Sequence, residues 1–232
     1  ALVTRRLDYY AAPLRDFFAE SELISEGKGL KPLNVYQTAE TPKIDGKLDD
    51  PCWQTIKPVR FVKAMDKTNP MPKYPTAVKA VWNRDGVTFG LKRTEPTPAM
   101  LKKDIGKQTR DASQIWWNDN VEIFLDVTGA REDYYQFIVN ASGSIWDAKG
   151  KNTEWNAAGT KAAAFVGEDY WSLEVHIPFN AFDKPLAPGT GVEWFGNFTR
   201  HRVTDRKDRE YQRLNTLFSG PSNDQNAFGP LR

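Results

Sequence analysis

Two adjacent tryptophans and a glutamate shortly after them are the side chains of this sequence best suited to binding a ligand. They lie in SQIWWNDNVEIFLD, from Ser113 to Asp126. An indole can stack on an apolar ligand face, and a carboxylate accepts hydrogen bonds from hydroxyls. Because Trp116 and Trp117 directly precede a strand, we expect them to point in opposite directions, with Trp116 exposed and Trp117 packed. Glu122 has two interpretations: an acceptor for ligand hydroxyls, or a surface glutamate paired with a basic residue on a neighbouring strand.

Three predicted strands, at residues 121–126, 135–140 and 171–177, each alternate between an apolar and a polar face. If these strands lie in one sheet, a single outer surface carries Glu122, Gln136, Asn140, Glu174 and His176. Amide, carboxylate and imidazole groups bordered by indoles suit a sugar, which offers both hydroxyls and C–H faces. Gln136 and Asn140 are the weaker candidates, since polar residues are ordinary on an outer face.

The sequence contains no convincing catalytic motif. The two histidines lack HExxH spacing, and ASGSIW lacks the GxSxG pattern of a nucleophile elbow. Glu122 and Glu174 could form a glycosidase pair at a separation of about 5–9.5 Å. Carboxylates on an outer sheet face, however, lack the enclosure that raises the pKa of a general acid. We therefore expect a non-catalytic protein.

The acidic segment IDGKLDDPCW has two interpretations. Asp45, Asp49 and Asp50 are the hard oxygen ligands that calcium prefers, but they lack the regular spacing of an EF-hand loop. Asp-Gly and Asp-Asp-Pro are also good turn formers. Turn chemistry is the favoured interpretation.

The pattern from about Leu33 onward predicts an all-β domain over residues 33–232. Short runs rich in Val, Ile, Phe, Trp and Tyr alternate with turns such as NRDG and VGEDY, as in antiparallel hairpins. The predicted fold is a two-sheet antiparallel β-sandwich of the immunoglobulin-like or jelly-roll type. The expected strands are LNVYQTA, TAVKAVWN, VTFGLKRT, VEIFLDV, YYQFIVNAS, SIWDAKG, KAAAFVG, YWSLEVHIP, EWFGNFTRHRV and EYQRLNTLF.

Residues 1–32 have a helical pattern, with apolar side chains at helical spacing from Val3 to Phe17. We expect a helical extension that docks on residues 33–232 or ends an upstream domain. The chain starts at Ala1 with neither an initiator methionine nor a signal-peptide pattern, which is typical of a processed product or an excised piece.

The overall composition excludes several classes of protein. With 32 basic and 30 acidic residues, the net charge of +2 produces no field that attracts nucleic acid. Cys52 is the single cysteine, so the chain has no disulfide framework and no thiolate zinc site. No apolar run approaches the ~20 residues of a membrane span.

A series of motifs resembles the family 9 carbohydrate-binding modules, the β-sandwich modules of secreted glycan-processing enzymes. The resemblance covers roughly Val35 to Arg232. In order, the motifs are PKIDGKLDDPCWQ, AVWNRDGVTFGLK, WWNDNVEIFLD, YYQFIVNASGSIWDA, WSLEVHIPFNAF and FGPLR.

The resemblance implies a site that clamps the end of a glycan chain between two tryptophans. One of them lies six residues before a strand glutamate, which corresponds to Trp116 and Glu122. The second precedes the terminal Phe-Gly, where residues 222–225 contain no aromatic side chain. A position occupied by arginine in the family is Ile138. The chain thus keeps one ring and the glutamate, but departs from the pattern at the second ring and the guanidinium.

The resemblance therefore implies a non-catalytic module that binds an oligosaccharide or polysaccharide end through Trp116, Glu122, Trp117, Gln136 and Asn140. The module would belong to a larger secreted or periplasmic glycan-degrading protein, with a catalytic domain covalently linked to it. Structural calcium is common in such relatives, but no ligand residues can be named.

Two alternatives remain open. One is a structural sandwich for interdomain packing, with a vestigial sugar site. The other is a haem-binding electron-transfer domain, with axial ligands drawn from the methionines and histidines. These are Met65, Met71, Met100, His176 and His201.

Overall fold

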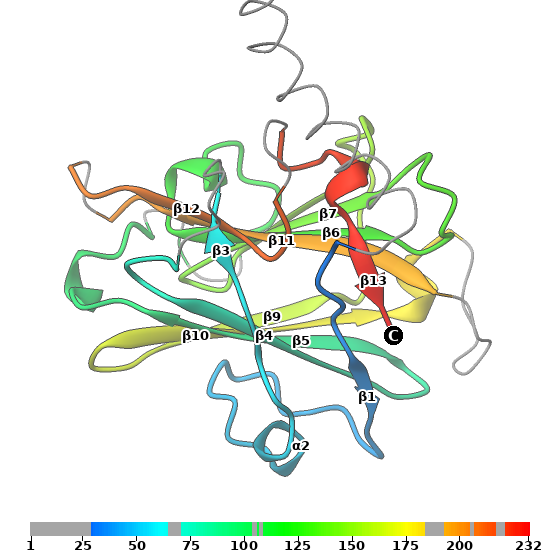
Figure 1. The fold of residues 1–232 in the computed structure, drawn as a ribbon, viewed down its shortest axis with the longest axis horizontal. Coiled ribbons are helices and arrows are strands. Elements are labelled where there is room, and N and C mark those ends of the chain that lie inside the picture. The colour runs from blue at the N-terminus through cyan, green and yellow to red at the C-terminus, as the bar shows by residue number, and fades with distance from the viewer. Residues whose placement is uncertain are drawn as a thin grey trace, which may run out of the picture.

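The protein is a sandwich of two β-sheets that lie face to face (Figure 1). The computed structural model describes residues 29–64, 71–103, 106, 109–183, 193–204, 207–216 and 221–232. The six-stranded sheet has the order β1-β4-β5-β10-β9, with β2 paired to β4. The seven-stranded sheet has the order β3-β12-β11-β6-β7-β8, with β13 paired to β11. The prediction of an all-β, two-sheet sandwich is confirmed.

The strands of the six-stranded sheet are β1 (Val35–Gln37), β2 (Val59–Arg60), β4 (Thr76–Trp82), β5 (Gly86–Thr94), β9 (Lys161–Val166) and β10 (Tyr170–Pro178). Those of the seven-stranded sheet are β3 (Val62–Lys63), β6 (Asn120–Asp126), β7 (Tyr135–Asn140), β8 (Ile145–Lys149), β11 (Trp194–Arg202), β12 (Glu210–Arg213) and β13 (Gly229–Leu231). Between the strands that the structure describes, all pairings are antiparallel except that of β1 with β4.

The helical elements within the described residues are short. They are α2 (Pro51–Gln54), η1 (Pro98–Met100), η2 (Ile115–Trp117), η3 (Phe179–Ala181) and η4 (Gln225–Ala227). Among the described residues, no helix is long and apolar enough to cross a membrane. The predicted helix over residues 1–32 falls almost entirely outside the described residues, so this extension and the domain boundary at residue 33 stay predictions.

The apolar core lies between the two sheets and follows from the alternation of each strand. Val121, Ile123 and Leu125 of β6 point inward and are fully buried, as are Leu173 and Val175 of β10. Burial of apolar surface on this scale is the main stabilising contribution to such a domain. The polar alternate residues of both sheets therefore face outward.

One end of the sandwich has a charged interior. Glu95 accepts hydrogen bonds from Arg202 Nε at 2.8 Å and from Arg200 Nη2 at 3.4 Å, and all three side chains are buried. The buried guanidinium of Arg93 stacks over the ring of Trp171, with Cζ 3.7 Å from the ring centroid. A buried charge is costly unless it is paired, so this network fixes how the two sheets meet at this end.

The loop before α2 crosses the outer face of the six-stranded sheet, on the side away from the second sheet (Figure 1). Gly46 has a φ of +87°, and a Cβ there would lie 2.6 Å from the backbone of Ala164. Asp45 Oδ1 accepts from the Lys47 amide at 3.1 Å, as in an Asx turn. The turn interpretation of this acidic segment is confirmed for Asp45.

The two ends of the described sandwich meet. β13 pairs with β11, while Leu33 forms a parallel bridge to Leu231. The amide of Leu33 donates to Pro230 O at 2.9 Å, and the amide of Arg232 donates to Leu33 O at 3.1 Å. Since the chain continues from Leu33 into β1, these hydrogen bonds connect one sheet to the other.

Candidate functional site

The outer face of the seven-stranded sheet, turned away from the six-stranded sheet, carries a continuous row of side chains. Strand pairing places Arg213, Thr199, Glu122, Ile138 and Trp146 side by side across β12, β11, β6, β7 and β8. Directly opposed residues of neighbouring strands share a face, so these five side chains form one patch. Glu122 lies at its centre.

Glu122 has a close polar neighbour at each carboxylate oxygen. Gln136 Nε2 donates to Oε2 at 2.7 Å, and His201 Nε2 lies 3.1 Å from Oε1. Glu122 is only 4% exposed. This geometry gives Glu122 the cross-strand partner of the second interpretation, although the partner is a histidine and the glutamate is buried.

Burial raises the pKa of Glu122 to about 7, although Gln136 and Arg213 act in the opposite direction. Burial, together with the nearby Arg213, lowers the pKa of His201 to about 4. At a pH between these two pKa values, Glu122 is therefore protonated and the His201 imidazole is neutral. The expectation that outer-face carboxylates lack enclosure is wrong for Glu122, because the side chains of the neighbouring strands cover it.

The exposures of the two tryptophans are the reverse of the prediction. Trp117 is 69% exposed, whereas Trp116 is partly buried, and its ring meets that of Trp146 edge-on with centroids 4.7 Å apart. The prediction assumed strand alternation, but η2 is a 3₁₀ turn with three residues per turn. Ile115 takes the inward position against Ile138, so Trp117 is left in solvent.

The remaining predicted residues on this sheet differ in role. Gln136 is half-buried and orients Glu122. Asn140 is fully buried: its Nδ2 donates to Asn118 Oδ1 at 3.0 Å, and its Oδ1 accepts from the amides of Ser142 and Ser144 at 3.0 Å. Asn140 therefore holds the turn that follows β7, and this gives it a structural role.

Glu174 and His176 do not join this patch, because β10 belongs to the other sheet. Glu174 accepts hydrogen bonds from the amides of Asp45 and Gly46 at 3.0 and 2.8 Å, and from Trp53 Nε1 at 2.8 Å. Since Glu122 and Glu174 lie on opposite outer faces of the sandwich, they cannot flank one glycosidic bond.

Two residues of β12 belong to the patch and were missed by sequence analysis. Arg213 is buried, and its Nη2 donates to Ser222 Oγ at 3.2 Å. Burial lowers the pKa of Arg213, while Glu122 and Asp224 raise it. Tyr211 is 42% exposed and meets His201 edge-on, with centroids 5.0 Å apart. The alternation of EYQR puts both side chains on one face, but only the strand pairing shows which face it is.

The segment before β13 lies against the same face. Asn223 Nδ2 donates to the hydroxyl of Tyr134 at 2.8 Å, and the rings of Phe124, Tyr134 and Phe228 pack together. Residues 221–225 bring amide, hydroxyl and carboxylate groups to this end of the patch. The opposite end carries Trp117.

The described residues give no geometric support for a metal or haem site. Within the described parts of the chain, no three His, Cys, Asp or Glu side chains converge as a metal site. His201 contacts Glu122, and His176 Nδ1 lies 2.9 Å from Thr88 Oγ1. Met71 and Met100 are 56% and 53% exposed, whereas Met65 is outside the described residues. Structural calcium stays an expectation without assigned ligands.

Comparison with known families identifies the fold and the class of protein. Residues 44–194 match the family "Carbohydrate family 9 binding domain-like", which covers more than half of the chain. The chain belongs to this family of non-catalytic carbohydrate-binding modules, in agreement with the resemblance seen in the sequence. A search of curated proteins found no match.

Solved structures of family 9 modules share the fold. One is a module from Caldicellulosiruptor kristjanssonii in complex with glucose, with a TM-score of 0.64 and 16% identity over 87% of this chain and 95% of that chain. Another is a module from the same organism in complex with cellotriose, with a TM-score of 0.61 and 16% identity over 87% of this chain and 93% of that chain.

Proposed function

We propose that this chain is a carbohydrate-binding module that holds the end of an oligosaccharide or polysaccharide on the outer face of its seven-stranded sheet. The observation that carries this proposal is the exposure of Trp117, at 69%, at one end of a patch of hydrogen-bonding side chains. An indole held in solvent loses the benefit of burial, which is expected where the ring stacks on a ligand. The glucose and cellotriose of the related modules fit this chemistry.

Each part of the patch has a role in this proposal. Trp117 stacks on the C–H face of a terminal sugar unit, and Tyr211 supplies a second exposed ring on β12. Glu122, oriented by Gln136 and His201, accepts a hydrogen bond from a hydroxyl. Arg213 and Ile138 lie on opposite sides of Glu122, and we assign to the Arg213 guanidinium the role of the arginine that the family pattern places at position 138.

We further propose that the module is an accessory part of a secreted or periplasmic protein with a glycan-degrading domain. This part of the proposal is supported by membership of the family. Its test is the enzymatic activity and cellular location of the protein that contains the chain.

The binding proposal is tested by calorimetry with glucose, cellobiose, cellotriose and the corresponding xylose and mannose oligomers. We expect Trp117→Ala to weaken binding of the best ligand by about 1–3 kcal/mol, the range of ring stacking on a nucleobase. Tyr36→Ala is the matched control, because Tyr36 is a 43% exposed aromatic on β1 of the other sheet. The same affinity in both variants would contradict the proposal.

A second candidate function is supported by the partial burial of Trp116 against Trp146. If the wild-type chain binds none of these sugars, the patch is vestigial and the sandwich serves to pack against another domain. In that case Trp117 is an interface residue, and Trp117→Ala weakens association with the neighbouring domain instead.

A further inference from the structure

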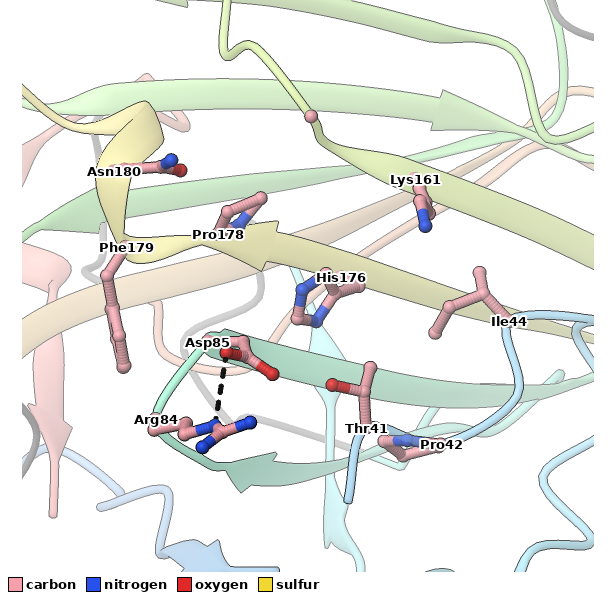
Figure 2. Close-up of a pocket in the computed structure, with 11 residues that line it drawn as sticks. Thr41, Pro42, Ile44, Arg84, Asp85, Lys161, His176, Pro178, Phe179 and Asn180 are labelled. Atoms are coloured by element: carbon pink, nitrogen blue, oxygen red, sulfur yellow. Dashed lines mark ion pairs between the residues drawn. The ribbon is translucent and has the colours of Figure 1, made fainter.

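The opposite face of the molecule has a cavity that the proposed sugar site does not use. It has a volume of about 980 Å³ and lies on the outer face of the six-stranded sheet. Its walls come from the loop at residues 41–44, the turn between β4 and β5, the start of β9, and η3 (Figure 2). A volume of this size is at the upper end of the range for small-molecule sites.

The walls of this cavity are fixed by hydrogen bonds. Asn83 Nδ2 donates to Thr41 Oγ1 at 2.8 Å, and Asn83 Oδ1 accepts from the amides of Asp85 and Gly86 at 2.9 and 3.2 Å. The amide of Phe179 donates to Asp85 O at 3.0 Å, so η3 is tied to the β4–β5 turn. The cavity is therefore preformed, which lowers the entropic cost of binding.

His176 lies among the lining residues, on β10 (Figure 2). His176 is only 7% exposed, and its Nδ1 lies within hydrogen-bond distance of Thr88 Oγ1, at 2.9 Å. Nε2 has no hydrogen-bond partner among the described residues. Burial lowers the pKa of this imidazole, and Lys161 lowers it further, so the ring is neutral at pH 7. The cavity floor thus offers one neutral hydrogen-bonding nitrogen.

The charge of the lining favours an anion with a single negative charge. Arg84 Nε lies 3.6 Å from Asp85 Oδ1, so these two exposed charges offset each other. Lys161 lies at the rim and has no ion pair with any residue that the structure describes. The remaining polar groups, Thr41 and Asn180, are neutral. The lining therefore has a net charge of about +1, carried by Lys161.

Apolar and polar groups alternate around the cavity. Pro42, Ile44, Pro178 and Phe179 present C–H and ring surfaces between the hydroxyl, amide, imidazole and ammonium groups. Phe179 is fixed by an edge-on contact with Trp194, with centroids 5.9 Å apart. A saccharide unit matches such a lining, since its hydroxyls and C–H faces alternate in the same way.

We propose that this cavity is a second carbohydrate site, which binds a hexuronate unit with its carboxylate at Lys161. The imidazole of His176 and the amide of Asn180 bind ring hydroxyls, and the apolar wall contacts the C–H face of the sugar. This site is separate from the patch around Trp117. The module would then hold two parts of an acidic glycan on opposite sides of the sandwich.

The test compares cellobiouronic acid with cellobiose, its neutral counterpart. Binding is measured by calorimetry and by amide chemical shifts, in the wild type and in Trp117→Ala. We expect Trp117→Ala to keep its affinity for cellobiouronic acid, with shifts at Lys161, His176 and Gly159. If only the first proposed site fails, the wild type does not bind cellobiose, whereas the wild type and Trp117→Ala both still bind cellobiouronic acid, so the two proposals fail independently.

Lys161→Gln, introduced into Trp117→Ala, tests the carboxylate contact. We expect it to lower the affinity for cellobiouronic acid by about threefold to tenfold, the range for a partly exposed charged hydrogen bond. Lys151→Gln, which changes an exposed lysine before β9, is the control and leaves the affinity unchanged. The proposal is overturned if Trp117→Ala does not bind cellobiouronic acid, if Lys161→Gln has no effect, or if the shifts lie on the seven-stranded sheet.

Discussion

At the scale of single residues, the Glu122–His201 pair makes the stability of the protein depend on pH in a specific way. Burial holds the pKa of folded Glu122 at about 7, against 4.5 for a glutamate side chain in water. The folded state therefore keeps a proton that the unfolded chain releases, and the resulting stabilisation is lost as the pH rises from about 4.5 to 7. His201 acts in the opposite direction, since its folded pKa is lowered to about 4.

Glu122→Gln removes the pH-dependent contribution of Glu122 to stability and leaves that of His201. We expect the stability of the wild type relative to Glu122→Gln to fall by up to about 3 kcal/mol between pH 4.5 and 7, and then to level off. The measurement is urea unfolding of both proteins across this range. Glu154→Gln, at an exposed glutamate, is the control for the loss of one carboxylate. A constant difference between wild type and Glu122→Gln would show that Glu122 titrates normally.

Several features of individual residues could be predicted from the sequence, whereas their surroundings could not. Strand alternation correctly placed Glu122 and Gln136 on one outer face. It could not show that Arg213 and His201, about eighty to ninety residues away along the chain, would cover Glu122. It also failed for Trp116 and Trp117, because strand periodicity was applied to a short 3₁₀ turn.

At the scale of elements, Glu174 anchors the loop before α2 to β10. Its carboxylate accepts hydrogen bonds from two loop amides and the Trp53 indole. Glu174→Ala leaves these three donors without their acceptor, and we expect a loss of about 3 kcal/mol in the free energy of unfolding. Hydrogen exchange at the amides of Asp45 and Gly46 should accelerate in the same variant.

Glu168→Ala is the control, because Glu168 is an exposed residue in the turn between β9 and β10. Sugar binding at the Trp117 patch should persist in both variants, since that patch lies on the other sheet. Unchanged exchange at Asp45 and Gly46 in Glu174→Ala would mean that other contacts hold the loop.

Most strands could be predicted from the sequence, but three of the shortest could not. β4, β5, β6, β7 and β10 coincide closely with runs that alternate between apolar and polar residues. β2, β3 and β13 contain only two or three residues each, too few to show a period, and their pairing depends on partners far along the chain. The sequence also could not show which strands share a sheet. For this reason Glu174 and His176 were placed on the same surface as Glu122, although β10 belongs to the other sheet.

At the scale of the whole molecule, β13 closes the sandwich. It pairs with β11 on one side and contacts the segment that leads into β1 on the other. Removal of residues 229–232 eliminates these hydrogen bonds and the buried Leu231 side chain. We expect the free energy of unfolding to fall by roughly 3 kcal/mol, taking about 1 kcal/mol for each of several lost backbone hydrogen bonds.

The measurement is chemical denaturation of the shortened chain beside Arg232→Ala. The substitution keeps the backbone hydrogen bonds of residue 232 but removes its exposed ion pair with Glu193. We expect Arg232→Ala to lie within about 1 kcal/mol of the wild type. Equal stability of the shortened chain and the wild type would show that β13 is dispensable.

The bridge between Leu33 and Leu231 has a consequence for protein engineering. Because these two positions are neighbours in space, a short linker could join them, and new termini could be opened in the β9–β10 turn near Glu168. Such a circular permutant would keep every strand pairing of the sandwich. The same proximity suits the module to insertion as a cassette within a surface loop of a host protein.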